Sequence, residues 1–360
     1  MTSFQKLSVE SLKSLSRLCG LSSSHTKREL ISNLNHAILR YSSSPSTLSN
    51  SSVWSPHVSN HRVLSVDMGL RNFSYSVLDL PDLEQIPTLS AWSLTSILPH
   101  TALALTQPDF SPAVAAQLAY TTFVEDILPR FNPDTILLER QRHRSGGSRN
   151  VLEWTLKVNM FENVLYGVLT TLINQGALKA QICEVLPSRT KGYWIRNAVL
   201  ATYSDGGGEN MSTRRKPVKN KYALSKLVKV NLVKRWTEGV SFDNPAACKH
   251  VVFTESTIPM ALQFHLSSSR SSRLRKLQSG ATAAETGTET ENADDVGLAA
   301  GRKLKLDDLS DSLLQGVAFV QWQRHRFELA KAVTNGADLA EFCKFMVDRH
   351  TPEMGMEELV

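Results

Sequence analysis

The sequence predicts an α/β protein in which helices pack against a mixed sheet of five strands. Two observations indicate this fold class. Five short apolar segments have the length and composition of strands, and two of them end in an acidic residue. Longer segments with apolar residues at helical spacing lie between and after them. The expected strands are residues 63–67, 73–80, 89–94, 135–139 and 181–186, and the expected helices are residues 111–128, 150–172, 221–236 and 306–326.

Composition narrows the class of protein. With 41% hydrophobic residues in a chain of 360, a sizeable core can form. No apolar run reaches the roughly 18 residues that span a bilayer, so we expect no membrane partner. The four cysteines show no C-x-x-C spacing, which argues against zinc fingers and a disulfide framework and fits a reducing compartment.

Residues 1–41 are expected to form a small helical unit. Leu12 and Leu15 have the spacing of an amphipathic helix, and Gly20 is placed to end it. Thr26 and Glu29 have the form of a capping box that begins a second helix. The sequence therefore predicts two short helices joined by a turn.

This helical unit resembles a SAP module, a family that binds duplex DNA. The resemblance implies DNA contacts from Lys27 and Arg28 at the start of the second helix. A generic helical hairpin is the alternative. The first 60 residues are also rich in serine and contain only two acidic residues, Glu10 and Glu29, which is typical of an organelle transit segment.

Changes in composition divide the rest of the chain. Residues 42–60 are rich in Ser, Pro and Asn and are expected to form a linker. The main domain is expected over residues 61–330, followed by a helical tail over residues 331–360. Residues 267–303 are low in complexity and too polar to form a core, so we expect a disordered insertion there.

Two clusters of basic residues are candidates for contact with a polyanion. From Asn210 to Thr237 the chain has nine basic residues and no acidic one, and a second basic run follows Glu139. A solvated face is the alternative for either run alone. The candidate DNA-binding residues in the main domain are Arg140, Arg142, Arg144, Arg149, Arg189, Lys191, Arg214, Arg215, Lys216, Lys219 and Lys221.

Five acidic residues occupy positions suited to a metal site. Asp67 ends the first expected strand and Glu139 ends the fourth, where α/β sheets usually place their sites. Asp307, Asp308 and Asp311 begin the last long helix, on which residues i, i+3 and i+4 share one face. Carboxylates brought together repel unless a cation lies among them, and Mg²⁺ prefers oxygen ligands. Two such ions can activate a water and stabilise the leaving oxygen of a phosphodiester.

Each acid alone also has a simpler interpretation. Asp67 is compatible with a turn, and Glu139 with an ion pair to a neighbouring arginine. Asp307 and Asp308 suit the positive end of a helix dipole. The order of the acids along the chain favours one shared site for metal-dependent phosphate chemistry.

Four motifs are specific when taken together. They are Asp67-Met68-Gly69-Leu70-Arg71-Asn72, Leu138-Glu139-Arg140-Gln141-Arg142-His143-Arg144-Ser145-Gly146, Leu186-Pro187-Ser188-Arg189 and Lys305-Leu306-Asp307-Asp308-Leu309-Ser310-Asp311-Ser312. By these four motifs, the chain resembles the fungal mitochondrial Holliday junction resolvases, which are relatives of bacterial RuvC in the RNase H-like superfamily. The resemblance covers residues 61–330 and extends to the N-terminal helices.

The resemblance implies an RNase H-like fold and a mitochondrial homodimer that binds four-way DNA junctions and makes paired symmetric cuts. It implies that Asp67, Glu139 and Asp311 bind Mg²⁺, for which Mn²⁺ can substitute. The fourth ligand is either Asp307 or Asp308, and we favour Asp308 because its i, i+3 spacing to Asp311 matches the RuvC pattern. No small-molecule substrate is expected.

Two other classes of function stay open at this point. Asp67-x-Gly after a strand also begins the actin-like fold of sugar kinases, but we find neither a second phosphate loop nor an adenosine motif. That alternative also leaves Asp307–Asp311 unexplained. A non-catalytic DNA-binding or architectural protein would use the SAP-like unit and the basic runs alone. The full set of acids argues against it, because acids near DNA are unfavourable without a metal.

Overall fold

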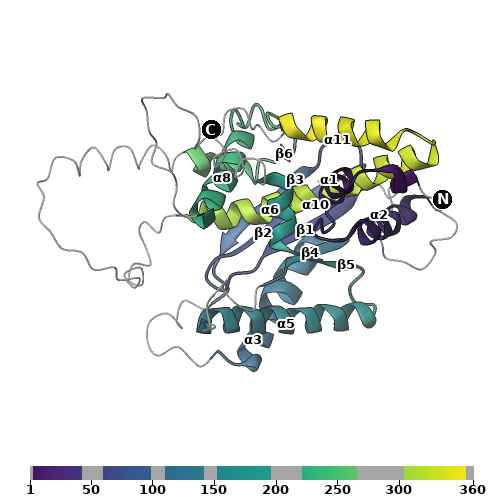
Figure 1. Cartoon of the computed structure of the whole chain (residues 1–360). Helices are drawn as coiled ribbons and strands as arrows, with labels where there is room; N and C mark the ends of the chain where they lie inside the picture. The colour runs from purple at the N-terminus through teal and green to yellow at the C-terminus, as the bar shows by residue number, and fades with distance from the viewer. Residues whose placement is uncertain are drawn as a thin grey trace, which may run out of the picture.

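A six-stranded sheet forms the centre of the molecule (Figure 1). The structure, a computed structural model, describes residues 3–42, 60–98, 110–141, 152–195, 221–265 and 304–353. The strands are β1 (His61–Asp67), β2 (Phe73–Leu80), β3 (Thr88–Thr95), β4 (Thr135–Glu139), β5 (Gln181–Val185) and β6 (Val252–Phe253). Their order is β5-β4-β1-β2-β3-β6. The β1-β2-β3 pairs are antiparallel, whereas β4, β5 and β6 each pair in parallel with a neighbour.

The mixed sheet is confirmed, but the expected number of five strands is wrong. The sixth strand, β6, pairs through only two residues with β3. A segment of two residues is too short to show the alternation by which strands are recognised in a sequence.

Helices cover both faces of the sheet (Figure 1). On one face lie α3 (Pro112–Ala119), the π-helix η4 (Tyr120–Ile127), α4 (Leu128–Phe131) and α5 (Glu153–Asn174). On the other lie α6 (Pro187–Trp194), α8 (Lys221–Trp236) and α10 (Leu306–Thr334). The helix expected over residues 111–128 is thus divided into the three segments α3, η4 and α4. Helix α6 is an addition to the expected elements, and α10 continues past its expected end at residue 326.

The alternation of side chains along β1 and β4 decides which way the strand-end acids face. Val63 and Leu137 pack in the core between the sheet and α10, whereas Leu64 packs in the core on the α5 side. Successive side chains of a strand point to opposite faces. Asp67 and Glu139 are each an even number of residues from Val63 and Leu137, so both acids lie on the α10 face.

The N-terminal unit packs against the second half of α10. It consists of a 3-10 helix η1 (Ser3–Lys6), α1 (Val9–Leu18) and α2 (Lys27–Ser42), and α11 (Leu339–Glu353) packs beside it. The predicted capping box is confirmed, because the Thr26 amide donates to Glu29 Oε2 at 2.9 Å. The carbonyls at the end of α1 contact α10: Leu18 O accepts from His325 Nδ1 at 2.8 Å.

Apolar residues of the N-terminal unit, α10 and α11 form one shared core. Its members are Phe4, Leu7, Leu12, Leu15, Cys19, Leu30, Leu34, Ile38, Leu329, Ala330, Ala332, Leu339 and Cys343. The unit is therefore packed on the main domain. Residues 43–59 of the expected linker and the expected insertion at 267–303 lie outside the described residues. Within the described part of the chain, every helix is too short or too polar to cross a membrane.

Candidate active site

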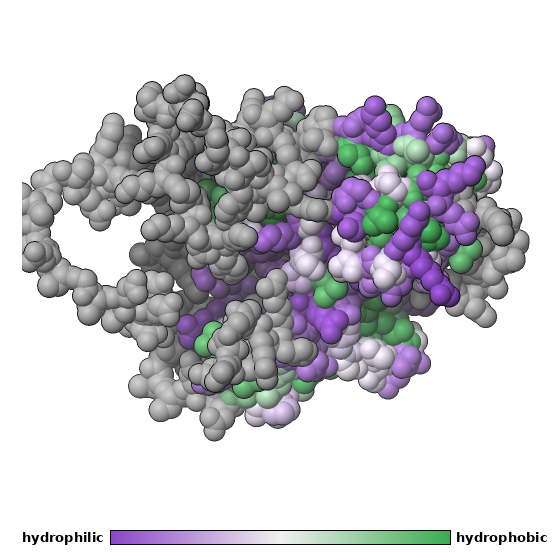
Figure 2. Space-filling view, in the orientation of Figure 1, coloured by the Kyte–Doolittle hydropathy of each residue, from purple (hydrophilic) through white to green (hydrophobic). Residues whose placement is uncertain are grey.

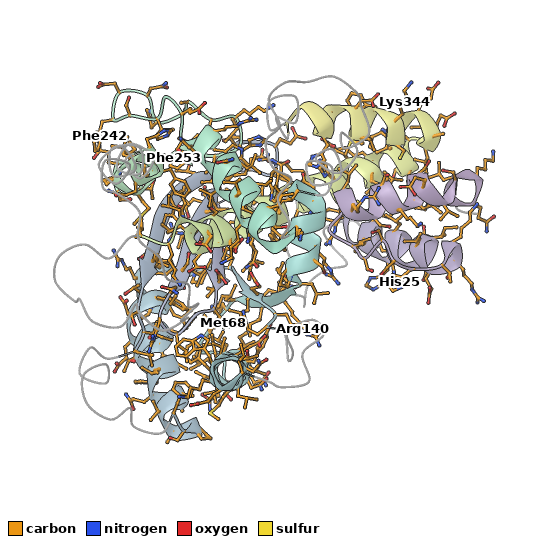
Figure 3. The ribbon with its side chains drawn as sticks, turned by 60° about the vertical axis from the view of Figure 1, so that its left-hand side comes forward. His25, Met68, Arg140, Phe242, Phe253 and Lys344 are labelled. Atoms are coloured by element: carbon orange, nitrogen blue, oxygen red, sulfur yellow. The ribbon has the colours of Figure 1, made fainter. Side chains whose placement is uncertain are left out.

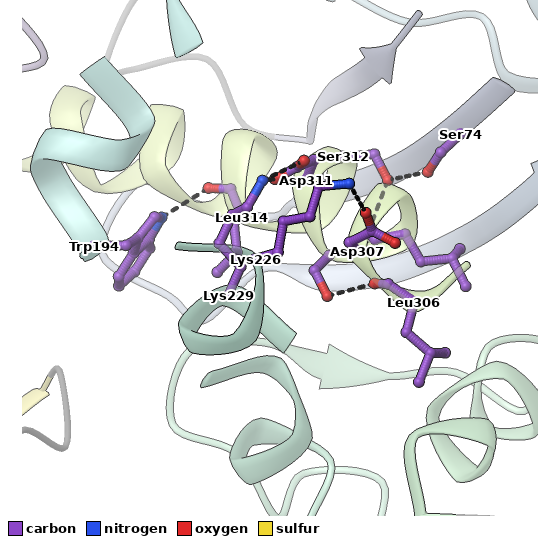
Figure 4. Close-up of polar contacts among 11 residues, drawn as sticks. Ser74, Trp194, Lys226, Lys229, Leu306, Asp307, Asp311, Ser312 and Leu314 are labelled. Atoms are coloured by element: carbon purple, nitrogen blue, oxygen red, sulfur yellow. Dashed lines mark hydrogen bonds and ion pairs between the residues drawn. The ribbon is translucent and has the colours of Figure 1, made fainter. Parts of the chain in front are cut away.

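The first turns of α10 lie very close to β1 and β2, because small polar side chains form the contact. Ser65 Oγ and Ser76 Oγ donate to the Ser312 carbonyl at 2.8 and 3.0 Å. The hydroxyls of Ser74 and Ser312 are 2.6 Å apart (Figure 4). Gln315 Nε2 lies 3.2 Å from Ser65 Oγ. These buried hydrogen bonds fix the register of α10 along the strands.

Two further features hold α10 in this position. Trp92 Nε1 donates to the Leu309 carbonyl at 3.1 Å. At Gly316 a Cβ atom would lie 2.9 Å from Leu78 Cδ1 and 3.2 Å from Ser65 Cβ. Only glycine permits this close approach without a shift of the neighbours. The helix segment that carries the acids is thereby seated directly on the sheet.

Parallel pairing of β1 and β4 brings Asp67 and Glu139 together. The residues just before the two acids are register partners, so both acids end neighbouring strands on the same side. Met68 and Arg140, which follow them in the sequence, lie at the same end of the sheet (Figure 3). The strand ends thus place both carboxylates near the start of α10.

The pKa of the Asp67 carboxyl is raised well above its ordinary value. Burial is the largest cause, and the negative charges of Glu139, Asp311 and Asp308 add to it. These charges come from β4 and from α10. The fold therefore concentrates carboxylates from three separate elements around one half-buried position.

Asp308 and Asp311 lie one turn apart on α10 and share a face. Burial raises the pKa of Asp308 to about 6, with a further contribution from the charge of Asp307. Burial also raises the pKa of Asp311, although the ammonium of Lys229 opposes this effect. Lys229 Nζ bonds both carboxylate oxygens of Asp311.

Asp307 has a different environment from its neighbour. Lys226 Nζ lies 2.7 Å from Asp307 Oδ2 (Figure 4). Burial alone would raise the pKa of Asp307, but the hydrogen bond and the charge of Lys226 together lower it. The charge of Asp308 acts on Asp67, whereas Asp307 is paired with a lysine of α8.

The chemistry of the acids suits a hard divalent cation. Asp67, Glu139, Asp308 and Asp311 offer only carboxylate oxygens, the ligands that Mg²⁺ and Mn²⁺ accept. As they stand, no three acidic, histidine or cysteine side chains of the described residues enclose a metal position. Instead, Asp311 is paired with Lys229. By its chemistry the donor set fits a magnesium-type ion, and these four acids are the residues that would hold it.

The candidate DNA contacts near the acids differ in exposure. Arg140 is exposed and pairs with Glu184, with 3.1 Å between Nε and Oε1. Lys191 is exposed on α6, whereas Arg189 is half-buried. Burial, and then the charge of Arg326, lowers the pKa of Arg189. Arg140 and Lys191 are therefore the more accessible of these candidates.

Lys27 and Arg28 are exposed at the start of α2, on the N-terminal unit. His25, just before them, lies away from Met68 and Arg140 (Figure 3). The part of the surface that is coloured in Figure 2 is largely hydrophilic, with scattered apolar residues. The remaining candidates, Arg142, Arg144, Arg149, Arg214, Arg215, Lys216 and Lys219, and the side chain of Lys221, lie outside the described residues.

Sequence reasoning missed two kinds of residue in the site. In the sequence, Lys226 and Lys229 belong to the basic run from Asn210 to Thr237 and do not stand out from it. Their spacing of three in an expected helix nevertheless indicates a shared face. Glu162, buried on α5, accepts from the Gln141 amide at 3.2 Å and so holds the backbone just after Glu139. No sequence signal separates this glutamate from a surface residue of α5.

Relatives of the chain are found among known proteins. The family described as "Mitochondrial resolvase Ydc2 / RNA splicing MRS1" matches residues 63–329. "Cruciform cutting endonuclease 1, mitochondrial" of Schizosaccharomyces pombe is 31% identical over 188 residues, which cover 51% of this chain and 65% of that protein. The Saccharomyces cerevisiae protein of the same name is 28% identical over 141 residues, 37% of this chain and 39% of that protein. The matched region is thus less than two thirds of either relative.

A solved structure has the same fold. The "Crystal Structure of the Yeast Mitochondrial Holliday Junction Resolvase, Ydc2" matches with a TM-score of 0.53 and 22% identity. The match covers 91% of this chain and 98% of the other. This similarity concerns the fold, and it confirms the RNase H-like α/β class predicted from the sequence.

Proposed function

Because the chain belongs to the mitochondrial resolvase Ydc2 / RNA splicing MRS1 family, we propose that it is a metal-dependent endonuclease that cuts four-way (Holliday) DNA junctions. The observation that carries the proposal is the grouping of Asp67, Glu139, Asp308 and Asp311 from two strand ends and one helix. Half-buried carboxylates with raised pKa values are unfavourable as charged groups unless a cation neutralises them. This favours the resolvase function over the RNA-splicing function named in the same family.

In the proposed reaction, the carboxylates of Asp67, Glu139, Asp308 and Asp311 would hold the metal. When bound there, magnesium, or manganese in its place, would supply an activated water and positive charge to stabilise the leaving oxygen of the phosphodiester. Hydrogen bonds to Ser312 keep the α10 acids in register with Asp67. Glu162 keeps the chain after Glu139 in place. Ser312 and Glu162 therefore act as positioning residues for the ligands.

We further propose that junction DNA contacts the exposed basic residues around this site. Arg140 directly follows Glu139, and Lys191 is exposed on α6. Lys27 and Arg28 would contact a more distant part of a duplex arm. Contacts with phosphates give salt-dependent affinity and orientation without reading the base sequence.

A homodimer is also proposed, because paired cuts in opposing strands need two sites related by symmetry. An apolar groove between η4 and α5 offers a surface for a second copy, and it is lined in part by Tyr120, Val124, Val168 and Leu172. Tyr120 is 48% exposed there. Val168→Asp should convert the dimer to a monomer in light scattering. A variant that stays dimeric would assign the interface to another face.

Both curated relatives are named mitochondrial, and we propose the same compartment for this chain. The serine-rich, acid-poor first 60 residues support import. Fractionation of cells that express the full chain with a C-terminal tag tests this, and a signal outside mitochondria would contradict it.

The substrate is tested with a synthetic four-way junction and a linear duplex of the same sequence, each in Mg²⁺. We expect cutting of the junction and almost none of the duplex. Equal cutting of both would contradict the branched substrate. Binding of structured RNA without cutting of any DNA would favour the splicing function instead.

A further inference from the structure

Two lysines of α8 pair with acids of α10 inside the candidate site (Figure 4). Lys229 Nζ bonds both carboxylate oxygens of Asp311, and Lys226 Nζ lies 2.7 Å from Asp307 Oδ2. Lysines three residues apart share one face of a helix, and α8 packs against α10. The Lys229 and Asp311 side chains are only 19% and 23% exposed. The Lys229–Asp311 ion pair is therefore sheltered from water.

A metal bound at Asp311 would therefore compete with a cation that is already there, the ammonium of Lys229. A carboxylate binds a divalent metal through the same oxygens that accept hydrogen bonds from an ammonium group. In a sheltered site the attraction between Asp311 and Lys229 is stronger than at the surface. A metal that takes Asp311 as a ligand has to displace the ammonium or lie beside it, where two positive charges repel.

We propose that Lys229 is an internal competitor of the metal at Asp311 and weakens metal binding in the DNA-free protein. Lys226 supports this role, because its pair with Asp307 holds α8 against the first turn of α10. The inference rests on the proposed metal-dependent function and adds a regulation of that site. Metal binding is then favoured when substrate phosphates accept the displaced ammonium.

A lysine is suited to such an exchange. Its compact charge sits on a flexible four-carbon stem with three donors, so it can exchange a carboxylate for a phosphate. The backbone of α8 does not have to move with it. The helix is held in the core by three of its own buried side chains, Val228, Leu232 and Val233.

Metal binding to the full chain without DNA tests the proposal. Free Mn²⁺ is measured by electron paramagnetic resonance for Lys229→Met and for Lys234→Met, which removes the same charge further along α8. We expect Lys229→Met to bind Mn²⁺ about tenfold more tightly than Lys234→Met. Lys226→Met should show a smaller gain. Equal or weaker binding by Lys229→Met overturns the proposal.

Thermal unfolding separates competition from a purely structural role of the lysine. In EDTA, Lys229→Met should unfold at a lower temperature than Lys234→Met, because Asp311 has lost its partner. Mn²⁺ should then raise the unfolding temperature of Lys229→Met more than that of the control. An equal deficit with and without Mn²⁺ overturns competition. Lys229→Gln supplies the same comparison if the methionine variant does not fold.

Failure of the underlying nuclease proposal has a different signature. In that case Lys229→Met and the double variant Asp67→Asn/Lys229→Met bind Mn²⁺ equally weakly, although the competing lysine is absent from both. Tight binding by the wild type that Asp67→Asn loses, together with no effect of Lys229→Met, overturns only the competition proposal.

Discussion

The two halves of α10 differ in what they bury. The second half is enclosed by apolar residues, and Leu329 and Ala330 are almost fully buried against the N-terminal helices. The first half carries Asp308 and Asp311, whose pKa values are raised by burial. Burial of apolar surface stabilises both halves, because Leu309, Leu313 and Leu314 of the first half are also fully buried. In the first half alone, partial burial of the two carboxylates opposes that stabilisation. The comparison teaches that the helix presents its acids at the end where apolar packing and hydrogen bonds have to offset the cost of burying charge.

The largest expected effect separates two neighbouring acids of the first half. Asp308→Asn should reduce junction cutting roughly 1,000-fold, because the loss of a metal ligand removes several kcal/mol of transition-state stabilisation. Asp307→Asn should stay within about tenfold of the wild type, because Asp307 pairs with Lys226. Cleavage rates in Mg²⁺ check this. If Asp307→Asn instead reduced cutting more than Asp308→Asn, Asp307 would be the metal ligand in place of Asp308.

A glycine in the N-terminal turn tests the second half of α10. Gly20 has a φ of +67°, and a Cβ there would lie 2.3 Å from Trp322 Cδ2. Gly20→Ala should lower the free energy of unfolding by about 3 kcal/mol through strain and overlap. Gly336→Ala is the control, since its φ is +66° with open space around it, and should cost only about 1 kcal/mol. Equal losses would show that the contact with Trp322 contributes nothing.

A second glycine, Gly316, tests how closely the first half of α10 packs against the sheet. Gly316→Val should destabilise the protein by about 2 kcal/mol, because the added atoms overlap Leu78 and Ser65. It should also slow cutting beyond the loss of folded protein, since Asp311 moves with the helix. Gly192→Val, in α6 with open space, is the matched control. Denaturant unfolding and cleavage of the same samples check both expectations, and unchanged cutting by folded Gly316→Val would contradict the second.

The smallest expected effect is on the pH dependence of stability. The folded-state pKa values of Asp67 and Asp308 are raised, the latter to about 6. Without metal, the fold should therefore lose stability as pH rises from the ordinary carboxyl range through 6. For Asp308 this amounts to about 1–2 kcal/mol once solvent screening is allowed for. Mg²⁺ should raise the unfolding temperature more at pH 7.5 than at pH 5. An equal rise at both pH values would contradict the raised pKa values of Asp67 and Asp308.

Local patterns explain what the sequence predicted well. Strands that end in Asp67 and Glu139 show as apolar runs followed by an acid. The spacing of Asp308 and Asp311 predicts a shared helix face, and it does so in any helix. The fold class follows from such patterns, because each element is identified by its own residues.

Contacts between distant segments explain what the sequence did not predict. Ser65, Ser74 and Ser76 have no local signal for a helix packed on them, because alternate serines also suit an exposed strand face. Lys226 and Lys229 look like a DNA-binding surface until α10 is placed beside them. The distinct environments of Asp307 and Asp308 likewise depend on which acid α8 reaches.

The most direct test of the metal-dependent nuclease is Asp67→Asn, assayed for both cutting and binding of a four-way junction. The control is Asp82→Asn, which removes one charge from an exposed turn after β2. Cutting by Asp67→Asn should be lost while junction affinity stays near that of the control, because the ligand is removed and the basic surface is kept. Cutting that survives in Asp67→Asn, or a joint loss of cutting and binding, would contradict the account.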